Sequence, residues 1–176
     1  AKRHGGVVLV ADQRGKTFVE RTGLSKFYDE IILGLDYIPK EVDPDIFWAA
    51  GKLYAIPLLK RSTKFKPHDE PIVSLDWDCV PWNYPDKTSD IMCLNLESTK
   101  WPWYKDCRSK YEKYVPKSIN WTLSPANNGV FHFNYYKHMI AYADLSTGFM
   151  EKFSKAAHAQ NYFDMPRYVY GDAMTF

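Results

Sequence analysis

Short apolar runs that end in a polar turn recur along the chain, and this pattern limits the fold more than any other feature. The first run occupies residues 7–11 and ends at Asp12; a later one, at residues 72–75, ends in an Asp-Trp-Asp turn that begins at Asp76. Continuous apolar runs of this length are typical of strands that are buried on both faces, as in parallel sheets. Further strand candidates are residues 28–35, 91–94 and 129–133.

Segments with helical spacing separate these strand candidates. Asp43 and Pro44 predict a helix start, with Asp at the N-cap and Pro at the first helical position, and Pro57 should end or kink that helix. In the last helical segment we expect Gly148 to interrupt the helix. The helix candidates are residues 16–24, 43–58, 103–114 and 135–159. The alternation predicts an α/β domain with a mostly parallel sheet flanked by helices.

The composition is that of a globular domain without a strong charge. Hydrophobic residues make up 45% and charged residues 25% of the 176 residues, which excludes the low hydrophobicity of disordered chains. With 23 basic and 21 acidic side chains, the formal net charge is +2. That balance argues against a specific nucleic-acid partner, although a few placed cations or a metal would suffice for a small phosphorylated ligand.

The cysteines and the hydropathy pattern favour a reducing compartment. Cys79, Cys93 and Cys107 are odd in number and contain no Cys-x-x-Cys pair, so we expect reduced structural thiols. No apolar stretch reaches the length of a transmembrane segment, and no signal-peptide pattern opens the sequence. We therefore expect a cytoplasmic protein with no transmembrane segment.

The Asp-x-Asp motif at Asp76 and Asp78 is the clearest candidate for a metal centre. Two carboxylates just past a strand suit a hard divalent cation, because Mg²⁺ and Mn²⁺ prefer oxygen ligands and often share them with substrate phosphates. In open α/β sheets, ligands bind beyond the carboxyl ends of the strands, where Asp12 is also predicted to lie. Taken alone, the pair more often marks a solvated turn at a strand end.

Several segments together resemble a known enzyme family. The segment that contains the Asp-x-Asp motif is similar to the strand and turn of GT-A glycosyltransferases, and more narrowly to capsular-polysaccharide-type glycosyltransferase-like proteins. The order of the matching pieces carries the resemblance, since each is loose by itself. They are residues 10–15, 47–55, 72–82, 126–130 and 171–176. The resemblance implies a single GT-A-like, Rossmann-related domain over residues 1–176.

The resemblance also implies a function and a set of roles. The chain is expected to be a metal-dependent glycosyltransferase that moves a sugar from a nucleoside-diphosphate sugar to a glycan or other acceptor, with Mn²⁺ or Mg²⁺ as cofactor. Asp78 would bind the metal directly, and Asp76 would contact the donor ribose or the metal shell. The other donor-binding residues would be Asp12 near the base or ribose, Lys52 near the phosphates, and Asn128 and Gly129 beside the sugar.

Each of these residues also has a plainer interpretation. Lys52 could be a solvated lysine on an amphipathic helix, and Asn128 with Gly129 a tight turn before a strand. Asp12 could cap the helix that follows it, and Asp172, which the resemblance places near the active site, could cap another. His132 and His138 offer a different metal hypothesis, but isolated histidines explain them better because the spacing of a helical zinc site is lacking.

The chain departs from the family pattern at both ends. The first strand and helix expected of GT-A enzymes, and a later metal-binding residue, are not found, so we expect a domain that lacks N-terminal and C-terminal parts of the full fold. A missing first strand would open a sheet edge that an oligomer or a partner chain could cover. An inverting enzyme would also need a base, for which Asp144, Glu151 and Asp172 are candidates by location.

Two alternatives compete with the transferase. A non-catalytic structural or glycan-binding protein could retain the fold, and the high aromatic content of 16% favours this interpretation. A sugar nucleotidyltransferase or a metal-dependent phosphoesterase is the second alternative. It ranks lower because a nucleotidyltransferase is expected to carry a Gly-rich phosphate loop, and only Gly5-Gly6 is present near the start.

Overall fold

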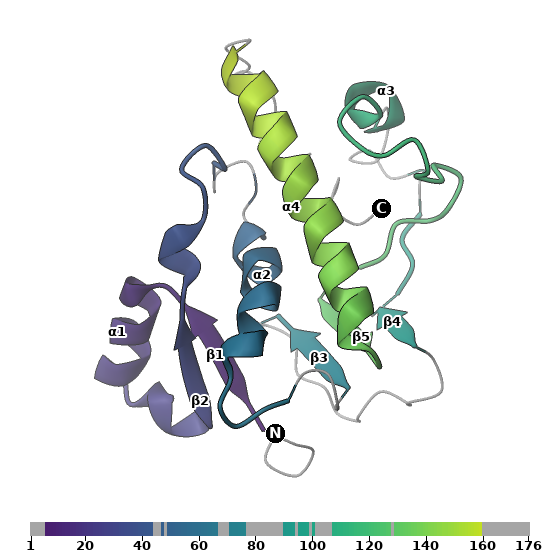
Figure 1. Cartoon of the computed structure of the whole chain (residues 1–176). Helices are drawn as coiled ribbons and strands as arrows, with labels where there is room; N and C mark the ends of the chain where they lie inside the picture. Colours follow the sequence, from purple (N-terminus) through teal and green to yellow (C-terminus); the bar gives the residue numbers. More distant parts are fainter. Residues whose placement is uncertain are drawn as a thin grey trace.

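A computed structural model describes most of the chain and shows a mixed α/β architecture (Figure 1). It describes residues 6–43, 47, 49–66, 71–76, 90–93, 95–98, 100, 107–127 and 129–159. The strands are β1 (Val8–Ala11), β2 (Glu30–Leu33), β3 (Ile72–Leu75), β4 (Ile91–Cys93) and β5 (Val130–Phe133). The α-helices are α1 (Gln13–Arg21), α2 (Ala50–Ala55), α3 (Cys107–Tyr111) and α4 (Tyr136–Ala159). The short 3₁₀ helices are η1 (Leu24–Phe27), η2 (Leu35–Tyr37) and η3 (Ile56–Arg61).

The first two strands form a small parallel sheet. β1 pairs with β2 in a register that places Val8 opposite Glu30 and Ala11 opposite Leu33. Parallel neighbours need a crossover connection, and the segment containing α1 supplies it. The bond from the Val7 amide to the Asp29 carboxylate, at 2.9 Å, fixes the start of this unit. The predicted strand–helix–strand unit at the beginning of the chain is therefore confirmed.

The other three strands form an antiparallel sheet in the order β3-β5-β4. Phe133 of β5 lies opposite Ile72 of β3 on one side and Ile91 of β4 on the other. The prediction of a mostly parallel sheet is wrong for the described strands, because only one of their three pairings is parallel. An apolar run indicates that a strand is buried on both faces. It does not indicate the direction of the strand, which depends on the path by which the chain returns to the sheet.

The hydrophobic core lies where α4 packs beside α2 (Figure 1). Phe47 is fully buried, and its ring makes edge-to-face contacts with Phe149 and Phe153 of α4, at centroid distances of 6.1 and 6.0 Å. Tyr111 of α3 adds a similar contact with Phe153 at 5.6 Å. Much of the aromatic content of the described residues thus packs the interior, where such edge-to-face pairs add to the apolar area that they bury.

Two helices differ in detail from their predicted form. α4 continues through Gly148 without a break for 24 residues, so the expected interruption is wrong. An internal glycine costs a helix only about 1 kcal/mol, which the burial of Phe149 and Met150 next to it offsets. The helix start predicted at Asp43 is wrong, because α2 begins at Ala50, but the end predicted at Pro57 is confirmed, since α2 gives way at Ile56 to the 3₁₀ helix η3. Within the part of the chain that the structure describes, no helix has both the length and the apolarity that a membrane crossing requires.

Glu30, the first residue of β2, ties this strand to the segment after η3. Its carboxylate accepts hydrogen bonds from the Thr63 amide at 2.9 Å, from the Thr63 hydroxyl at 3.0 Å and from the Ser62 hydroxyl. The bond from Ser62, and next the one from the Thr63 backbone, lower the pKa of Glu30 below its ordinary value of 4.5. The charged carboxylate therefore stabilises the folded chain, and this contribution disappears as the pH falls through the lowered pKa.

Replacing Glu30 by glutamine tests this contact. We expect Glu30→Gln to lower the free energy of unfolding at pH 7 by about 1 kcal/mol or less, because the carboxylate is solvent-accessible and its bonds are partly screened. Urea unfolding at pH 7 and pH 3 measures the effect. The difference between parent and variant should be smaller at pH 3, because the protonated fraction of Glu30 in the parent rises as the pH falls toward the lowered pKa. An equal difference at both pH values would rule out a role for the charge.

Candidate functional site

Asp76 directly follows β3, and the antiparallel ladder holds it opposite Gly129. The Asp76 amide donates a 2.9 Å hydrogen bond to the Gly129 carbonyl. This bond extends the β3–β5 ladder by one residue beyond the pair of Leu75 and Val130. Two of the predicted donor-binding residues are thereby brought together, although they lie far apart in the sequence. Because the backbone itself makes this bond, the position of Asp76 is fixed independently of its side chain.

Asn127, for which no role was expected from the sequence, shapes the turn that presents Gly129. Its side-chain oxygen accepts a 2.9 Å bond from the Gly129 amide, and its side-chain nitrogen donates to Glu97 at 2.8 Å. Asparagine side chains that bond to the backbone two residues ahead are a common device in turns. The Asn-x-Gly spacing was the signal in the sequence that could have revealed it.

Lys52 reaches this site from α2, the helix that precedes β3 in the chain. Its Nζ atom forms an ion pair with Oδ1 of Asp76, and the two side chains are 30% and 21% exposed. The pairing contradicts the interpretation of Lys52 as a plain solvated lysine. An ion pair that is still open to water contributes about 1 kcal/mol or less to stability, so its main consequence is to place opposite charges side by side.

The described residues meet the needs of a divalent cation only in part. Asp76 offers one carboxylate, which is compatible with a magnesium-type site that takes one or two carboxylates and completes its shell with phosphates and water. Among the side chains that the structure describes, no group of three or more His, Cys, Asp or Glu residues comes together. The predicted direct ligand, Asp78, lies outside the described residues, as do Asn128 and Asp172.

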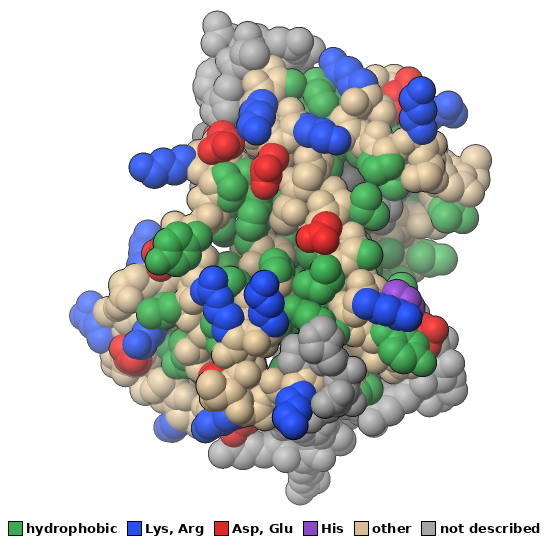
Figure 2. Space-filling model, viewed as in Figure 1, with side chains coloured by type: hydrophobic (Ala, Val, Ile, Leu, Met, Phe, Trp, Pro, Cys, Tyr) green, Lys and Arg blue, Asp and Glu red, His purple; other side chains and the backbone are tan. Residues whose placement is uncertain are grey.

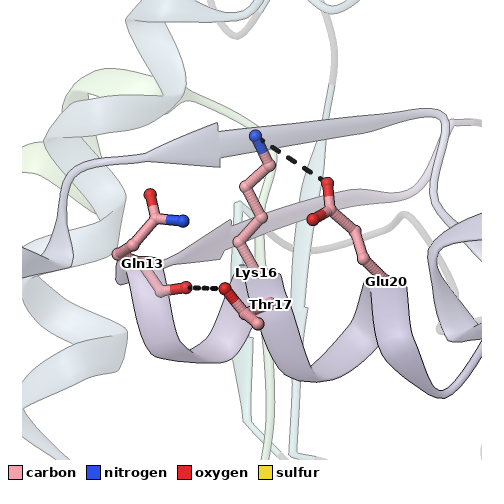
Figure 3. A network of polar contacts seen from close by, with 4 residues as sticks. All are labelled: Gln13, Lys16, Thr17 and Glu20. Atoms are coloured by element: carbon pink, nitrogen blue, oxygen red, sulfur yellow. Dashed lines mark hydrogen bonds and ion pairs between the residues drawn. The ribbon is translucent and has the colours of Figure 1, made fainter.

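Asp12 caps helix α1. Its Oδ1 atom accepts a hydrogen bond from the Gly15 amide at 2.6 Å, and its carbonyl accepts one from Lys16 at 3.0 Å. The helix consequently begins at Gln13, three residues earlier than predicted. Along its surface Lys16 and Glu20 pair at 3.8 Å, and the Thr17 hydroxyl donates to the Gln13 carbonyl at 2.9 Å (Figure 3). The capping interpretation is confirmed, while a role of Asp12 in donor binding stays a prediction.

The cap predicts a measurable effect on stability. Asp12→Ala is expected to lower the free energy of unfolding by about 1 kcal/mol, since the Gly15 amide then loses its partner in the protein. Asp12→Asn keeps a side-chain acceptor and should lose much less. Thermal and urea unfolding of the two variants measure the difference. If both variants matched the parent in stability, the capping bond would contribute nothing.

The predicted bases on α4 have different surroundings. Glu151 accepts a 3.0 Å hydrogen bond from the hydroxyl of Tyr54 on α2. Burial, and next the bond to Glu151, raise the pKa of Tyr54, so this hydroxyl remains a donor at neutral pH. Asp144 lies exposed on the surface of α4. Neither carboxylate has a described contact with Lys52, Asp76 or Gly129, and their role as a base stays a prediction.

The surroundings of His132 and Cys93 indicate structural roles. His132 is fully buried in the central strand β5, opposite Val73 and Met92. Burial raises the pKa of the Cys93 thiol, whose sulfur donates to the Asn95 carbonyl at 3.5 Å. A raised thiol pKa lowers the fraction of reactive thiolate at neutral pH. Both observations agree with the structural roles expected from the sequence.

Comparison with known proteins adds no family to this description. No protein-family model, no curated protein and no solved structure matches the chain. The site is therefore defined by its own geometry, in which Lys52, Asp76 and Gly129 meet at the carboxyl end of β3.

Proposed function

We propose that the chain is a metal-dependent glycosyltransferase that uses a nucleoside-diphosphate sugar as donor and a glycan or other molecule as acceptor. The observation that carries this proposal is the meeting of Lys52, Asp76 and Gly129, three residues that the resemblance to GT-A enzymes assigns separately to donor binding. A carboxylate, an ammonium group and a residue without a side chain are suited to a metal, a diphosphate and a sugar, respectively.

Each residue would have a distinct role in donor binding. The Asp76 carboxylate would hold the metal shell or the ribose, together with Asp78. The Lys52 ammonium would bind the diphosphate, for which a compact cation with three donors is well suited. Gly129 would leave room beside its backbone for the sugar. When bound, Mn²⁺ or Mg²⁺ would neutralise negative charge that develops on the leaving diphosphate.

The direct test is calorimetric titration of the protein with a panel of nucleoside diphosphates and nucleotide sugars, with and without Mn²⁺. The proposal predicts that one nucleotide class binds only, or far more tightly, when Mn²⁺ is present. If the folded protein bound no nucleotide under either condition, the transferase assignment would be withdrawn.

A second candidate is a non-catalytic glycan-binding protein, and exposed aromatic residues favour it. The side chains of Phe18, Phe27 and Tyr37 are 56%, 58% and 82% exposed, and they lie on α1, η1 and η2, respectively. Apolar side chains also interrupt the charged surface in several small groups (Figure 2). Aromatic faces of this kind suit sugar rings. Glycan binding without any nucleotide binding would select this candidate.

A partner chain or oligomer that covers an open sheet edge also remains part of the proposal. Among the described residues, β1 pairs only with β2, and β3 pairs only with β5. Edges with unpaired backbone groups are the places where another strand can add.

A further inference from the structure

An open groove lies beside helix α1, between this helix and the 3₁₀ helix η2. Its volume of about 800 Å³ lies within the range of about 300–1,000 Å³ that is usual for small-molecule sites. None of its lining residues belongs to the site at the end of β3. The lining includes Gln13, Arg14, Phe18 and Arg21 of α1 and Asp36 of η2.

Arg14, Phe18 and Arg21 lie on one face of α1. Their spacing of four and then three residues places them on successive turns along the same side of the helix. The two arginines are therefore about 10 Å apart along the helix axis, with the aromatic residue between them in height. Val19, which points to another side, is buried and holds the helix against the protein, whereas more than half of the Phe18 side chain is exposed.

The position of Arg14 is not explained by the stability of α1. Arg14 lies in the first turn, where the helix dipole disfavours a cation and where α1 has no acidic residue. Arg21 lies in the last turn, where the same dipole favours a cation. Within the described part of the chain, neither guanidinium group forms a hydrogen bond or an ion pair. Both cations are therefore available to an anionic ligand.

Asp36 gives the same groove a hydrogen-bond acceptor. Its Oδ2 atom accepts a 3.0 Å bond from the Gln13 amide, which fixes the carboxylate beside the start of α1. Its Oδ1 atom makes no hydrogen bond to any described residue and can accept one from a hydroxyl group. A carboxylate at this place disfavours a compact, highly charged anion such as phosphate. It suits a ligand that carries hydroxyl groups as well as separated negative charges.

We propose that the groove beside α1 binds an acidic saccharide, that is, a short chain of sugar rings that bear carboxylate groups. Phe18 offers an aromatic face to a sugar ring. Arg14 and Arg21 bind carboxylates, which a guanidinium group can hold through two parallel hydrogen bonds. Asp36 accepts a hydrogen bond from a sugar hydroxyl. The inference does not depend on the transferase, because it uses no residue of the proposed metal and nucleotide site.

Calorimetric titration of the full chain with trigalacturonic acid, and with its uncharged methyl ester, tests the proposal. We expect the acid to bind about tenfold more tightly than the ester, because both ligands have the same rings and only the acid can pair with the arginines. Arg14→Gln and Phe18→Ala should each lower the affinity for the acid about fivefold. In amide NMR spectra, the acid should shift the signals of residues 13–21 before others.

Lys16→Gln is the matched control for Arg14→Gln. It removes one positive charge from the same helix, but Lys16 does not line the groove and pairs with Glu20 instead (Figure 3). Its affinity for the acid should equal that of the parent. An equal loss in Lys16→Gln and Arg14→Gln would reduce the effect to net charge and overturn the proposal.

The remaining outcomes are equally decisive. If the parent bound neither saccharide, or if the shifted signals lay outside α1 and η2, the groove would not be the site. Equal affinity for acid and ester would reject the role of the arginines, and displacement of the acid by an equal concentration of inorganic phosphate would identify a phosphate site instead. Titration of the same variants with nucleotide and Mn²⁺ keeps this result separate from the proposed function, because Arg14→Gln should leave that affinity unchanged.

Discussion

Asp76→Asn is expected to reduce the Mn²⁺-dependent affinity for a nucleoside diphosphate at least about 100-fold. Loss of residues that merely support a metal ligand costs 10- to 100-fold, so loss of the ligand charge should cost at least as much. The fold should survive, because asparagine has nearly the same size and the backbone bond from residue 76 to Gly129 does not involve the side chain. Calorimetric titration with and without Mn²⁺ measures the affinity, and urea unfolding checks the fold.

A matched control separates the site from the net charge of the protein. Glu20→Gln removes one negative charge from an exposed position on α1 and should leave nucleotide affinity unchanged. Stability of Asp76→Asn should lie within about 1 kcal/mol of the parent, as expected for the loss of a solvent-accessible ion pair. We expect Asp78→Ala to show the same loss of binding. If Asp76→Asn bound the nucleotide as well as the parent does, the metal centre would lie elsewhere.

Phe47→Ala is expected to destabilise the protein by about 3–5 kcal/mol, the largest effect on folding that the structure predicts. The Phe47 ring is fully buried and contacts Phe149 and Phe153, so its removal leaves a cavity between the segment before α2 and helix α4. Domains of this kind have free energies of unfolding of about 5–15 kcal/mol, so this single change would remove a large part of the total. Urea unfolding monitored by circular dichroism measures it.

Phe18→Ala serves as the control for Phe47→Ala. The Phe18 side chain lies on α1 with 56% of its surface exposed, and its loss should change stability by about 0.5 kcal/mol or less. A loss below about 1 kcal/mol in Phe47→Ala would contradict the described core.

The sequence predicts individual elements better than their arrangement. β3 has the bounds expected from its apolar run, and β2 lies inside the predicted segment. These runs are local signals of strand structure, but the expected burial on both faces is wrong for these two strands: only Ile72 of β3 and Ile32 of β2 are buried, while Leu75 and Leu33 are exposed. The antiparallel direction of β5 depends on contacts with Ile72 and Ile91, which are far from it in the chain, and no local pattern encodes that choice. The interruption of the helix predicted at Gly148 is wrong for the same reason, because the packing of the neighbouring residues keeps the helix intact.

In the site, as in the fold, neighbouring residues predict single features but not the contacts between residues that are far apart in the sequence. The resemblance names Lys52, Asp76 and Gly129 individually, but their contact joins α2, β3 and the turn before β5, which only the folded chain brings together. The capping role of Asp12 is a local property and was accessible from the residues around it. The hydrogen bond from Tyr54 to Glu151 joins residues that are 97 positions apart in the sequence, and no pattern near either residue predicts it.

We propose that a metal and a nucleotide bind together at the carboxyl end of β3. Amide NMR spectra of the 20.5 kDa chain, recorded with a nucleoside diphosphate during addition of Mn²⁺, test it most directly, because the paramagnetic ion broadens the nearest signals first. We predict that the amides of Asp76 and Gly129 lose intensity before those elsewhere in the chain, and that Asp76→Asn removes the effect. Selective broadening around another part of the chain, or none at all, would contradict the account.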